Sequence, residues 1–168
     1  MTFVRKHPEH IEDSVWGNLA SVMVKEAKIM TDRNTPRALA DLYAKGLAVA
    51  LEQDGVVIGY IAAWPIGKGF LEVGSAWIHS DYRGNGHAST LYTTLHTLLL
   101  KRTEHVFAIT QNPIALKAGR HARLELNGCW TDPIPWEHTC APCEWVEDSK
   151  KLTCGHRNNI CMLRIMQR

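Results

Sequence analysis

Hydrophobic residues recur at helical spacing in the first third of the chain. From His10 to about Met30 they return every three or four positions, which indicates an amphipathic helix with one buried face. These residues are Ile11, Val15, Leu19, Val22, Met23 and Ala27. A second helix is predicted from Pro36, which suits a first turn, to Gly46, which suits a C-terminal cap.

The middle of the chain changes to the pattern of strands. Residues 46–67 hold two hydrophobic runs separated by Gln53-Asp54-Gly55, and Asp-Gly between such runs is a strong signal for a hairpin. Residues Phe70–Ile78 form a further run with strand character. Three consecutive strands are therefore predicted after the two helices.

The later elements complete a mixed order. A turn that contains glycine, at Asp81–Gly86, leads to a predicted helix, strand, helix and final strand. These are expected at His87–Lys101, His105–Thr110, Ile114–Leu126 (closed by Asn127-Gly128) and Ile160–Met166. The predicted order, ααβββαβα and then β, defines a mixed α/β domain.

Composition supports a single soluble domain spanning residues 1–168. The chain is 45% hydrophobic and 21% charged, which excludes wholesale disorder. Lys+Arg 19 against Asp+Glu 17 gives a net charge of +2, which does not indicate a nucleic-acid or membrane partner. No apolar run reaches the roughly 20 residues needed to span a bilayer. The charged start of the sequence lacks a signal core, so a cytoplasmic protein is expected.

One turn carries candidate chemistry. Arg83-x-x-Gly86-x-Ala88 leaves a predicted strand and opens a predicted helix. Small residues let the backbone approach a ligand closely, and free N–H groups at a helix N-terminus favour an anion. The turn is therefore a candidate pyrophosphate site, although an ordinary glycine turn before a capped helix explains the same six residues.

The surrounding residues 78–86, Ile-His-Ser-Asp-Tyr-Arg-Gly-Asn-Gly, resemble motif A of the GNAT superfamily, the Gcn-type N-acetyltransferases. The usual form of that motif is strand, V-x-P-x-Y-R-G-x-G, helix, and Ser80 stands here in place of the proline. The likeness extends over about 130 residues and includes Gly128-Cys129-Trp130, which is similar to the family's Gly-Phe ending. It implies an α/β (α+β) GNAT-like fold, with a mixed, mostly antiparallel sheet flanked by helices, and acetyl-CoA as cosubstrate.

The resemblance also implies which residues bind the cofactor. Backbone amides of the turn would bind the pyrophosphate, the backbone near Ile78 would hold the pantetheine, and Asn112 would face the pantetheine arm. The implied set is Ile78, Arg83, Gly84, Asn85, Gly86, His87, Ala88 and Asn112. For Asn112 a strand-end Asn-Pro turn is the structural alternative.

Acetyl transfer to an amine requires a base for the amine and an acid for the leaving thiolate. Glu72, six residues before Ile78, occupies a position where several members of the family place the base, and the even spacing predicts one sheet face for both residues. An exposed strand glutamate or a substrate-binding anion are the alternatives. The family's frequent tyrosine acid is replaced by Leu124, which leaves Tyr82 and His121 as weaker candidates.

Cysteines gather near the end of the sequence, in a segment at 136–168. Cys140, Cys143, Cys154 and Cys161 fall within 22 residues, and Cys140-Ala-Pro-Cys143 has the C-x-x-C spacing of a zinc knuckle. A structural zinc site in the connection between the last two strands is the leading interpretation, with His156 as an alternative ligand. Disulfides and unliganded thiols are the competing interpretations.

The sequence therefore predicts an acetyl-CoA-dependent N-acetyltransferase that acts on a primary amine. A binding or regulatory module that uses a GNAT scaffold and the cysteine-rich segment is the alternative from another class. A transferase of another acyl group, or one that modifies a nucleobase, is also compatible with the fold. The acceptor and the oligomeric state stay open at this point.

Overall fold

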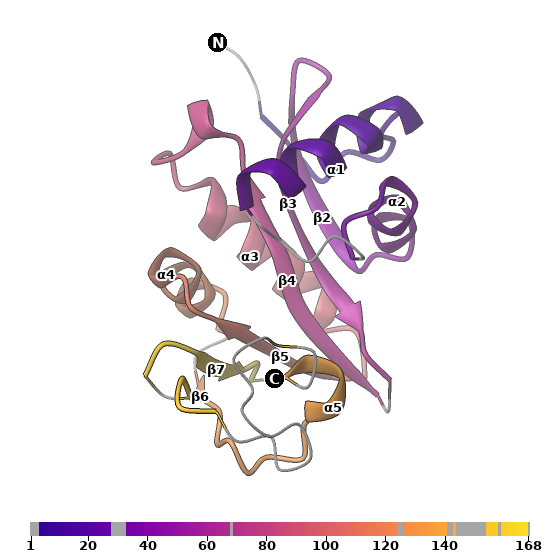
Figure 1. Ribbon diagram of the computed structural model, residues 1–168. Coiled ribbons are helices and arrows are strands. Elements are labelled where there is room, and N and C mark those ends of the chain that lie inside the picture. Colours follow the sequence, from indigo (N-terminus) through magenta and orange to yellow (C-terminus); the bar gives the residue numbers. More distant parts are fainter. Residues whose placement is uncertain are drawn as a thin grey trace.

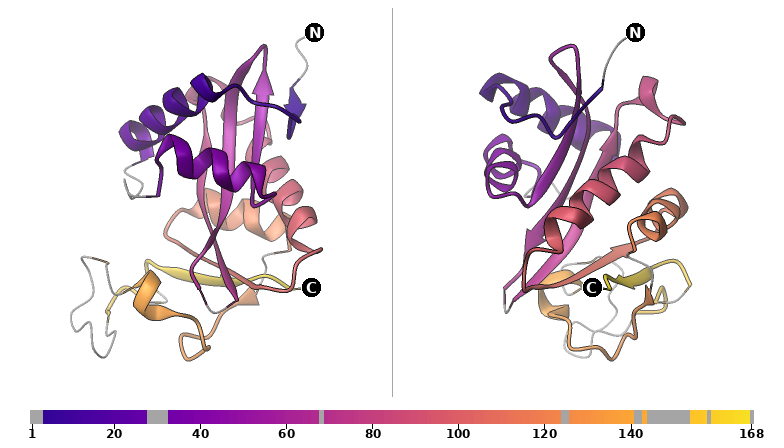
Figure 2. Two further views of the ribbon diagram at one scale, coloured as in Figure 1. Left: turned by 90° about the vertical axis from the view of Figure 1, so that its right-hand side faces the viewer. Right: turned by 180° about the vertical axis from the view of Figure 1, so that it is seen from behind.

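The chain folds around one seven-stranded sheet with helices on both faces (Figures 1 and 2). The computed structural model describes residues 4–27, 33–67, 69–123, 126–140, 143, 154–157 and 159–167. The strand order is β1-β2-β3-β4-β5-β7-β6, and only the β4–β5 pair is parallel among the strands described. The predicted mixed, mostly antiparallel sheet is therefore confirmed.

The elements follow one another much as the hydrophobic pattern predicts. The strands are β1 (Arg5–Lys6), β2 (Ala48–Gln53), β3 (Val56–Pro65), β4 (Phe70–Ile78), β5 (His105–Thr110), β6 (Leu126–Asn127) and β7 (Met162–Ile165). The helices are α1 (Asp13–Ala27), α2 (Pro36–Ala44), η1 (Ser80–Tyr82), α3 (His87–Leu99), α4 (Pro113–His121) and α5 (Trp136–Thr139). The boundaries predicted for β4 and β5 are confirmed to the residue.

Local signals explain several of these boundaries. The side chain of Thr35 accepts a hydrogen bond from the Ala38 amide at 3.2 Å and caps α2, and Pro36 occupies its first turn. Gly46 takes a φ of 65° directly after α2, which is the left-handed conformation that commonly ends a helix. The β2–β3 hairpin turns at Asp54-Gly55, as predicted, and both residues have positive φ.

The last part of the predicted α4 is wrong. The helix ends at His121 instead of Leu126, and Arg123 takes a φ of 59°, which cannot continue a right-handed helix. Leu126 and Asn127 instead form β6 and pair with β7. The short elements β1 and α5 were not predicted, because two and four residues carry too little periodicity to be recognised.

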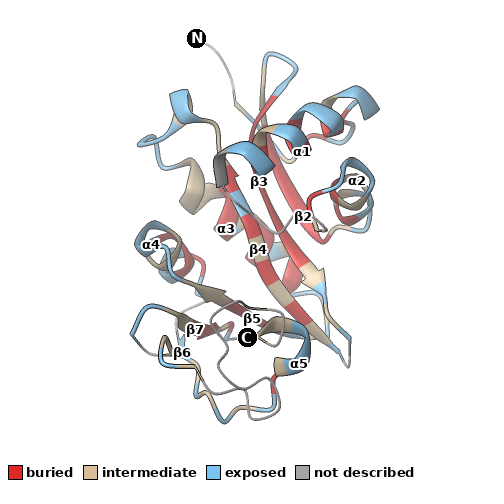
Figure 3. Ribbon diagram, in the orientation of Figure 1, coloured by how far each residue is buried: buried red, intermediate tan, exposed pale blue. Residues whose placement is uncertain are grey.

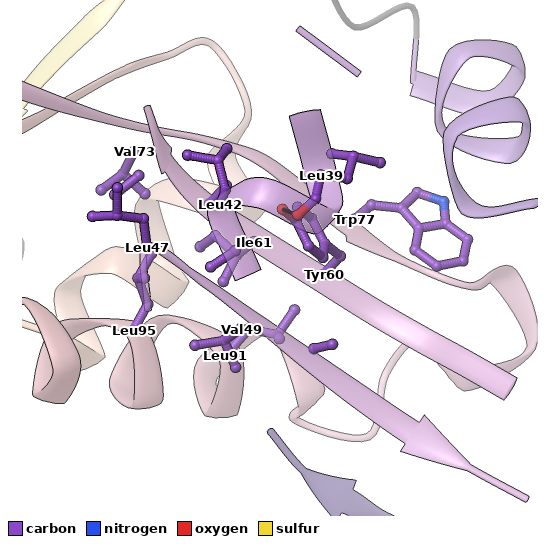
Figure 4. Close-up of a cluster of buried hydrophobic side chains, with 14 of the residues drawn as sticks. Leu39, Leu42, Leu47, Val49, Tyr60, Ile61, Val73, Trp77, Leu91 and Leu95 are labelled. Carbon is purple, nitrogen blue, oxygen red and sulfur yellow. Dashed lines mark hydrogen bonds between the residues drawn. The ribbon is translucent and has the colours of Figure 1, made fainter. Parts of the chain in front are cut away.

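The core lies between the sheet and the two helical layers. Helices α1 and α2 cover one face and α3 and α4 the other, while β2 and β3 are buried over most of their length (Figures 2 and 3). On one side Leu39 of α2 packs near Tyr60, whose hydroxyl donates to the Leu39 carbonyl at 3.0 Å. On the other side Leu91 and Leu95 of α3 lie near β2 and β3 (Figure 4).

Strand β4 contains a bulge that the sequence did not reveal. Between their regular pairs, β4 supplies two residues, Ser75 and Ala76, where β3 supplies only Ile61. Ser75 takes a φ of 52°, a left-handed conformation that is uncommon outside glycine. Such a bulge changes the direction of the side chains that follow it.

The bulge separates two residues that were expected on one face. Glu72 pairs with Trp64 and Ile78 pairs with Gly59, and residues 59 and 64 lie an odd number of positions apart on β3. A Cβ on Gly59 would lie 2.7 Å from the Ile78 side chain and 3.3 Å from Leu91 of α3. The prediction that Glu72 and Ile78 share a face is therefore wrong.

Candidate functional site

Strands β4 and β5 diverge in the middle of the sheet, and we call the unpaired interval between their backbones the notch. They pair over three residue pairs, from Phe70 with His105 to Glu72 with Phe107. Beyond this point β4 continues to Ile78 and β5 to Thr110 without further pairing between them, and Figure 1 shows their ribbons separating. Backbone groups that face each other across such a gap have no ladder partner there and can bond a ligand.

The turn between β4 and α3 has free space beside the backbone of its two glycines. Gly84 and Gly86 take φ values of 83° and 78°, and a Cβ on either would meet no atom of the described residues within 4 Å. Gly86 is the N-cap of α3 and supplies no side-chain cap for the first N–H groups of the helix. His87 and Ala88, at the start of α3, are half-buried. This is a backbone arrangement that can accept a phosphate group.

Side chains fix this turn to the end of β4. The Arg83 Nε donates to the Ile78 carbonyl at 2.9 Å, and the Asp81 amide donates to His79 Nδ1 at 3.3 Å. Asn85 reaches back to the Tyr82 carbonyl at 3.4 Å. The turn therefore enters α3 in one defined conformation, with its glycines facing open space.

Asn112 follows β5 on the opposite side of the notch. Its Oδ1 accepts a hydrogen bond from the Ile114 amide at 2.9 Å, so it is the N-cap of α4. The Thr110 hydroxyl in turn accepts from the Asn112 amide at 3.1 Å. The structural alternative for Asn112, a capped Asn-Pro turn, thus describes its present contacts.

Glu72 lies at the last β4–β5 pair, on the sheet face covered by α1 and α2. Its Oε2 forms an ion pair with Arg33 Nη1 at 2.7 Å, and the two side chains are only 12% and 18% exposed. The Arg33 guanidinium also lies 5.9 Å from the centre of the Trp64 ring. Sequence reasoning found Glu72 but missed Arg33, because residues 39 positions apart give no local signal.

A buried polar chain continues from this ion pair toward the bulge. The Trp64 Nε1 donates to Ser75 Oγ at 3.1 Å, and Ser75 Oγ donates to Asn34 Oδ1 at 2.9 Å. Asn34 is 2% exposed and directly follows Arg33. The segment before α2 therefore delivers two polar side chains onto the sheet beside the bulge, among otherwise apolar neighbours.

The candidate acids lie at separate places. Tyr82 is half-buried in η1, where its ring lies 5.7 Å from that of His79. His121 is exposed at the end of α4. Leu124, which stands where the family often has tyrosine, lies outside the described residues. The structure therefore gives neither Tyr82 nor His121 a contact with Glu72.

The four cysteines proposed as metal ligands lie within the described part of the chain, each half-buried. In that part no group of three or more His, Cys, Asp or Glu side chains has the arrangement of a metal site. Burial nevertheless raises the pKa of the Cys161 thiol, and negative charge on Cys154, Cys143 and Cys140 raises that pKa further. The four thiols therefore share one electrostatic neighbourhood.

N–H groups donate to two of these sulfur atoms. The His156 amide donates to Cys154 Sγ at 3.4 Å, and Gln111 Nε2 donates to Cys161 Sγ at 3.6 Å. Burial raises the pKa of Cys140, and the nearby Arg157 opposes that rise through its charge and a hydrogen bond. Donors of this kind stabilise anionic sulfur.

The Arg157 guanidinium packs against two indole rings, whose centres lie 5.3 Å apart. Its guanidinium carbon lies 5.0 Å from the centre of the Trp130 ring and 5.1 Å from that of Trp136. Its Nε and Nη2 are buried and have no hydrogen-bond partner within the described residues. A cation with unused donors therefore lies beside Cys140.

Comparison with known proteins identifies the family. The sequence matches the acetyltransferase (GNAT) family over residues 19–120, which is more than half of the chain. The protein is therefore a member of the GNAT acetyltransferase family, as the resemblance predicted. No curated protein matches the sequence.

Solved structures share the fold at low sequence identity. Ard1 from Thermoplasma volcanium has a TM-score of 0.58 and 10% identity, with 99% of each chain covered. The yncA protein from Salmonella typhimurium, solved with its cofactor acetyl-CoA, has a TM-score of 0.52 and 19% identity, covering 71% of this chain and 76% of that one. A GCN5-related N-acetyltransferase from Kribbella flavida has a TM-score of 0.54 and 12% identity, covering 71% of this chain but only 32% of its own.

These likenesses establish the GNAT acyltransferase fold for this chain. The protein is therefore an acetyltransferase by family. None of the helices in the described part of the chain is long and apolar enough to cross a membrane.

Proposed function

We propose that the protein transfers the acetyl group of acetyl-CoA to a primary amine, with the donor bound in the notch between β4 and β5. The open glycine turn before α3 carries this proposal. Its two positive-φ glycines and uncapped helix start leave room and N–H groups for the pyrophosphate. The pantetheine would then run past Ile78 and Asn112, at the two edges of the notch. A cytoplasmic location belongs to the same proposal.

Glu72 is proposed as the base. It takes a proton from the acceptor ammonium, directly or through one water molecule, and frees the nitrogen lone pair. The nitrogen attacks the thioester carbonyl, a C–N bond forms, and the C–S bond breaks to release the CoA thiolate. After the attack the nitrogen carries one proton more than the amide keeps, and the loss of this proton balances the proton that the thiolate gains. The side chain that relays it is unassigned. Glu72 lies next to the notch, at the last β4–β5 pair, and is only 12% exposed, which supports this role.

Glu72→Gln is expected to lower kcat by about 10²-fold, a typical contribution of a general base. The affinity for CoA should not change, because the glycine turn lies at the other end of β4. A higher pH should restore part of the rate, since it supplies more neutral amine. Steady-state kinetics and CoA calorimetry measure both effects.

Glu52→Gln is the matched control, because Glu52 also pairs with an arginine, Arg5, at 4.0 Å. That pair lies at the far edge of the sheet, on β1 and β2. Equal losses in the two variants would show that Glu72 acts only through stability and would remove it as the base.

The function itself is tested by release of CoA thiol from acetyl-CoA in the presence of amine, peptide, aminoglycoside and polyamine acceptors. Product mass spectra identify the acetylated nitrogen and exclude simple hydrolysis. Tight CoA binding with no turnover on any acceptor would favour the alternative, a binding module built on the GNAT scaffold.

We also propose that residues 136–168 form a cysteine-rich segment with a structural zinc site, ligated by Cys140, Cys143, Cys154 and Cys161. The shared neighbourhood of the four thiols supports it, as do the N–H donors at Cys154 and Cys161 and the cation beside Cys140. A tetrathiolate zinc site carries net negative charge, and outer N–H donors and a nearby cation stabilise such a site. The metal would tie the connection between β6 and β7, with no part in acetyl transfer.

A further inference from the structure

The ion pair between Arg33 and Glu72 creates a difficulty for the proposed base. A carboxylate oxygen 2.7 Å from a guanidinium nitrogen is already engaged in a charge-assisted hydrogen bond. Such a carboxylate has to be released, at least in part, before it can approach an incoming ammonium group.

The pair joins the segment before α2 to β4. Both side chains are largely buried, and burial of two charges costs solvation energy that their attraction offsets only with good geometry. Arg33 is followed directly by Asn34, which bonds Ser75 and so fixes the segment before α2 to β4. The fold therefore holds a cation in a fixed position beside the candidate base, and both groups keep some contact with solvent.

We infer that the acceptor carries an anionic group close to its amine, as an amino acid does, and that Arg33 binds this group. The inference rests on the proposed function and names its substrate class. The carboxylate of the acceptor pairs with the Arg33 guanidinium in place of Glu72. The Glu72 carboxylate is then released and faces the ammonium group of the acceptor. The zwitterionic acceptor thus replaces the Arg33–Glu72 ion pair with two ion pairs, one to Arg33 and one to Glu72.

The flanking residues fit this assignment. The Trp64 ring lies 5.9 Å from the Arg33 guanidinium and restricts its position, while Trp64 is itself anchored through Nε1 to Ser75. Gly74, two residues after Glu72, lies on the same face, and among the described residues a Cβ there would contact only Trp64, at 3.7 Å. A polyamine or aminoglycoside offers only positive charge, which Arg33 repels.

Matched acceptor pairs test the inference. Lysine and 1,5-diaminopentane differ by one carboxylate, as do phenylalanine and 2-phenylethylamine. We expect kcat/KM to be about 10–100-fold higher for the carboxylate member of each pair, the usual range for a charge-assisted bidentate contact. Arg33→Gln should remove most of this preference, mainly through KM, and Arg33→Lys should restore part of it.

Arg5→Gln is the control, since it removes an arginine from another Arg–Glu pair of the same sheet and should leave the preference intact. Equal rates within each pair, or a preference that survives Arg33→Gln, would overturn the inference and leave acetyl transfer standing.

Calorimetry of acceptor binding to the CoA-loaded protein tests the anionic subsite separately from acetyl transfer. Binding of lysine but not of 1,5-diaminopentane, lost in Arg33→Gln, supports the anionic subsite even where no acetyl group is transferred. No difference in binding within either pair contradicts it.

Discussion

Gly86→Glu is expected to abolish detectable binding of acetyl-CoA, while the domain stays folded. Gly86 is the N-cap of α3, and its Cβ position faces open space in which the donor pyrophosphate is proposed to lie. A glutamate there adds bulk and a negative charge beside a phosphate group, and it also occupies the free N–H groups of the helix. Calorimetry with CoA and with acetyl-CoA measures the loss.

Backbone strain has to be separated from this effect, because Gly86 has a φ of 78° and any side chain is disfavoured there. Gly55 is a matched control: it has the same φ of 78° and also has nothing within 4 Å of its Cβ position. Gly55→Glu is therefore expected to cost a similar amount of stability, about 1 kcal/mol, and to leave CoA affinity unchanged. Unaltered CoA affinity in Gly86→Glu would remove the pyrophosphate assignment.

Local signals were sufficient for most of the fold. The Asp54-Gly55 turn, the Pro36 start of α2 and the alternation along β4 each act within a few residues, so the sequence could predict them. The glycine turn before α3 was recognised in the same way. Its open backbone follows directly from the residue types at Gly84 and Gly86.

Features set by distant contacts could not be predicted. The bulge at Ser75 arises where β4 has one residue more than β3 between two regular pairs, and the hydroxyl of Ser75 is held by Trp64 and Asn34 from other elements. No pattern within β4 indicates this, so the face of Ile78 was wrongly predicted. Arg33 was missed for the same reason, since its partner lies on a strand 39 residues away.

For the cysteines, the sequence predicted one pair of ligands and the structure added their neighbours. The C-x-x-C spacing indicated Cys140 and Cys143 as a ligand pair, but only the structure relates them to Cys161 and to Arg157. The contacts of Arg157 with Trp130 and Trp136 further connect this segment to residues that follow β6. The proposed ligand Cys140 therefore lies beside the cation that packs on these two rings, so the zinc proposal can be tested separately at the cysteines and at Arg157.

Protein purified without chelator is expected to contain about one zinc ion per chain, as a closed tetrahedral thiolate site requires. Cys143→Ser should lose this zinc and lower the melting temperature, because metal binding of this kind supplies much of the folding free energy of a small segment. Elemental analysis and thermal unfolding with and without a chelator measure both effects. CoA affinity should change little, since the glycine turn and the cysteines lie on different parts of the chain.

Cys129→Ser is the control for the loss of a thiol as such. Cys129 is exposed, its Sγ lies 2.8 Å from the Thr131 hydroxyl, and it is outside the proposed ligand set, so its replacement should retain the zinc. Arg157→Gln should keep the metal but bind it more weakly, because outer partners of metal ligands typically contribute 10–100-fold in affinity. Zinc-free protein with freely titratable thiols, and a melting temperature that neither chelator nor Cys143→Ser alters, would reject the site. In that case Arg157 and its two tryptophans hold the segment by packing alone.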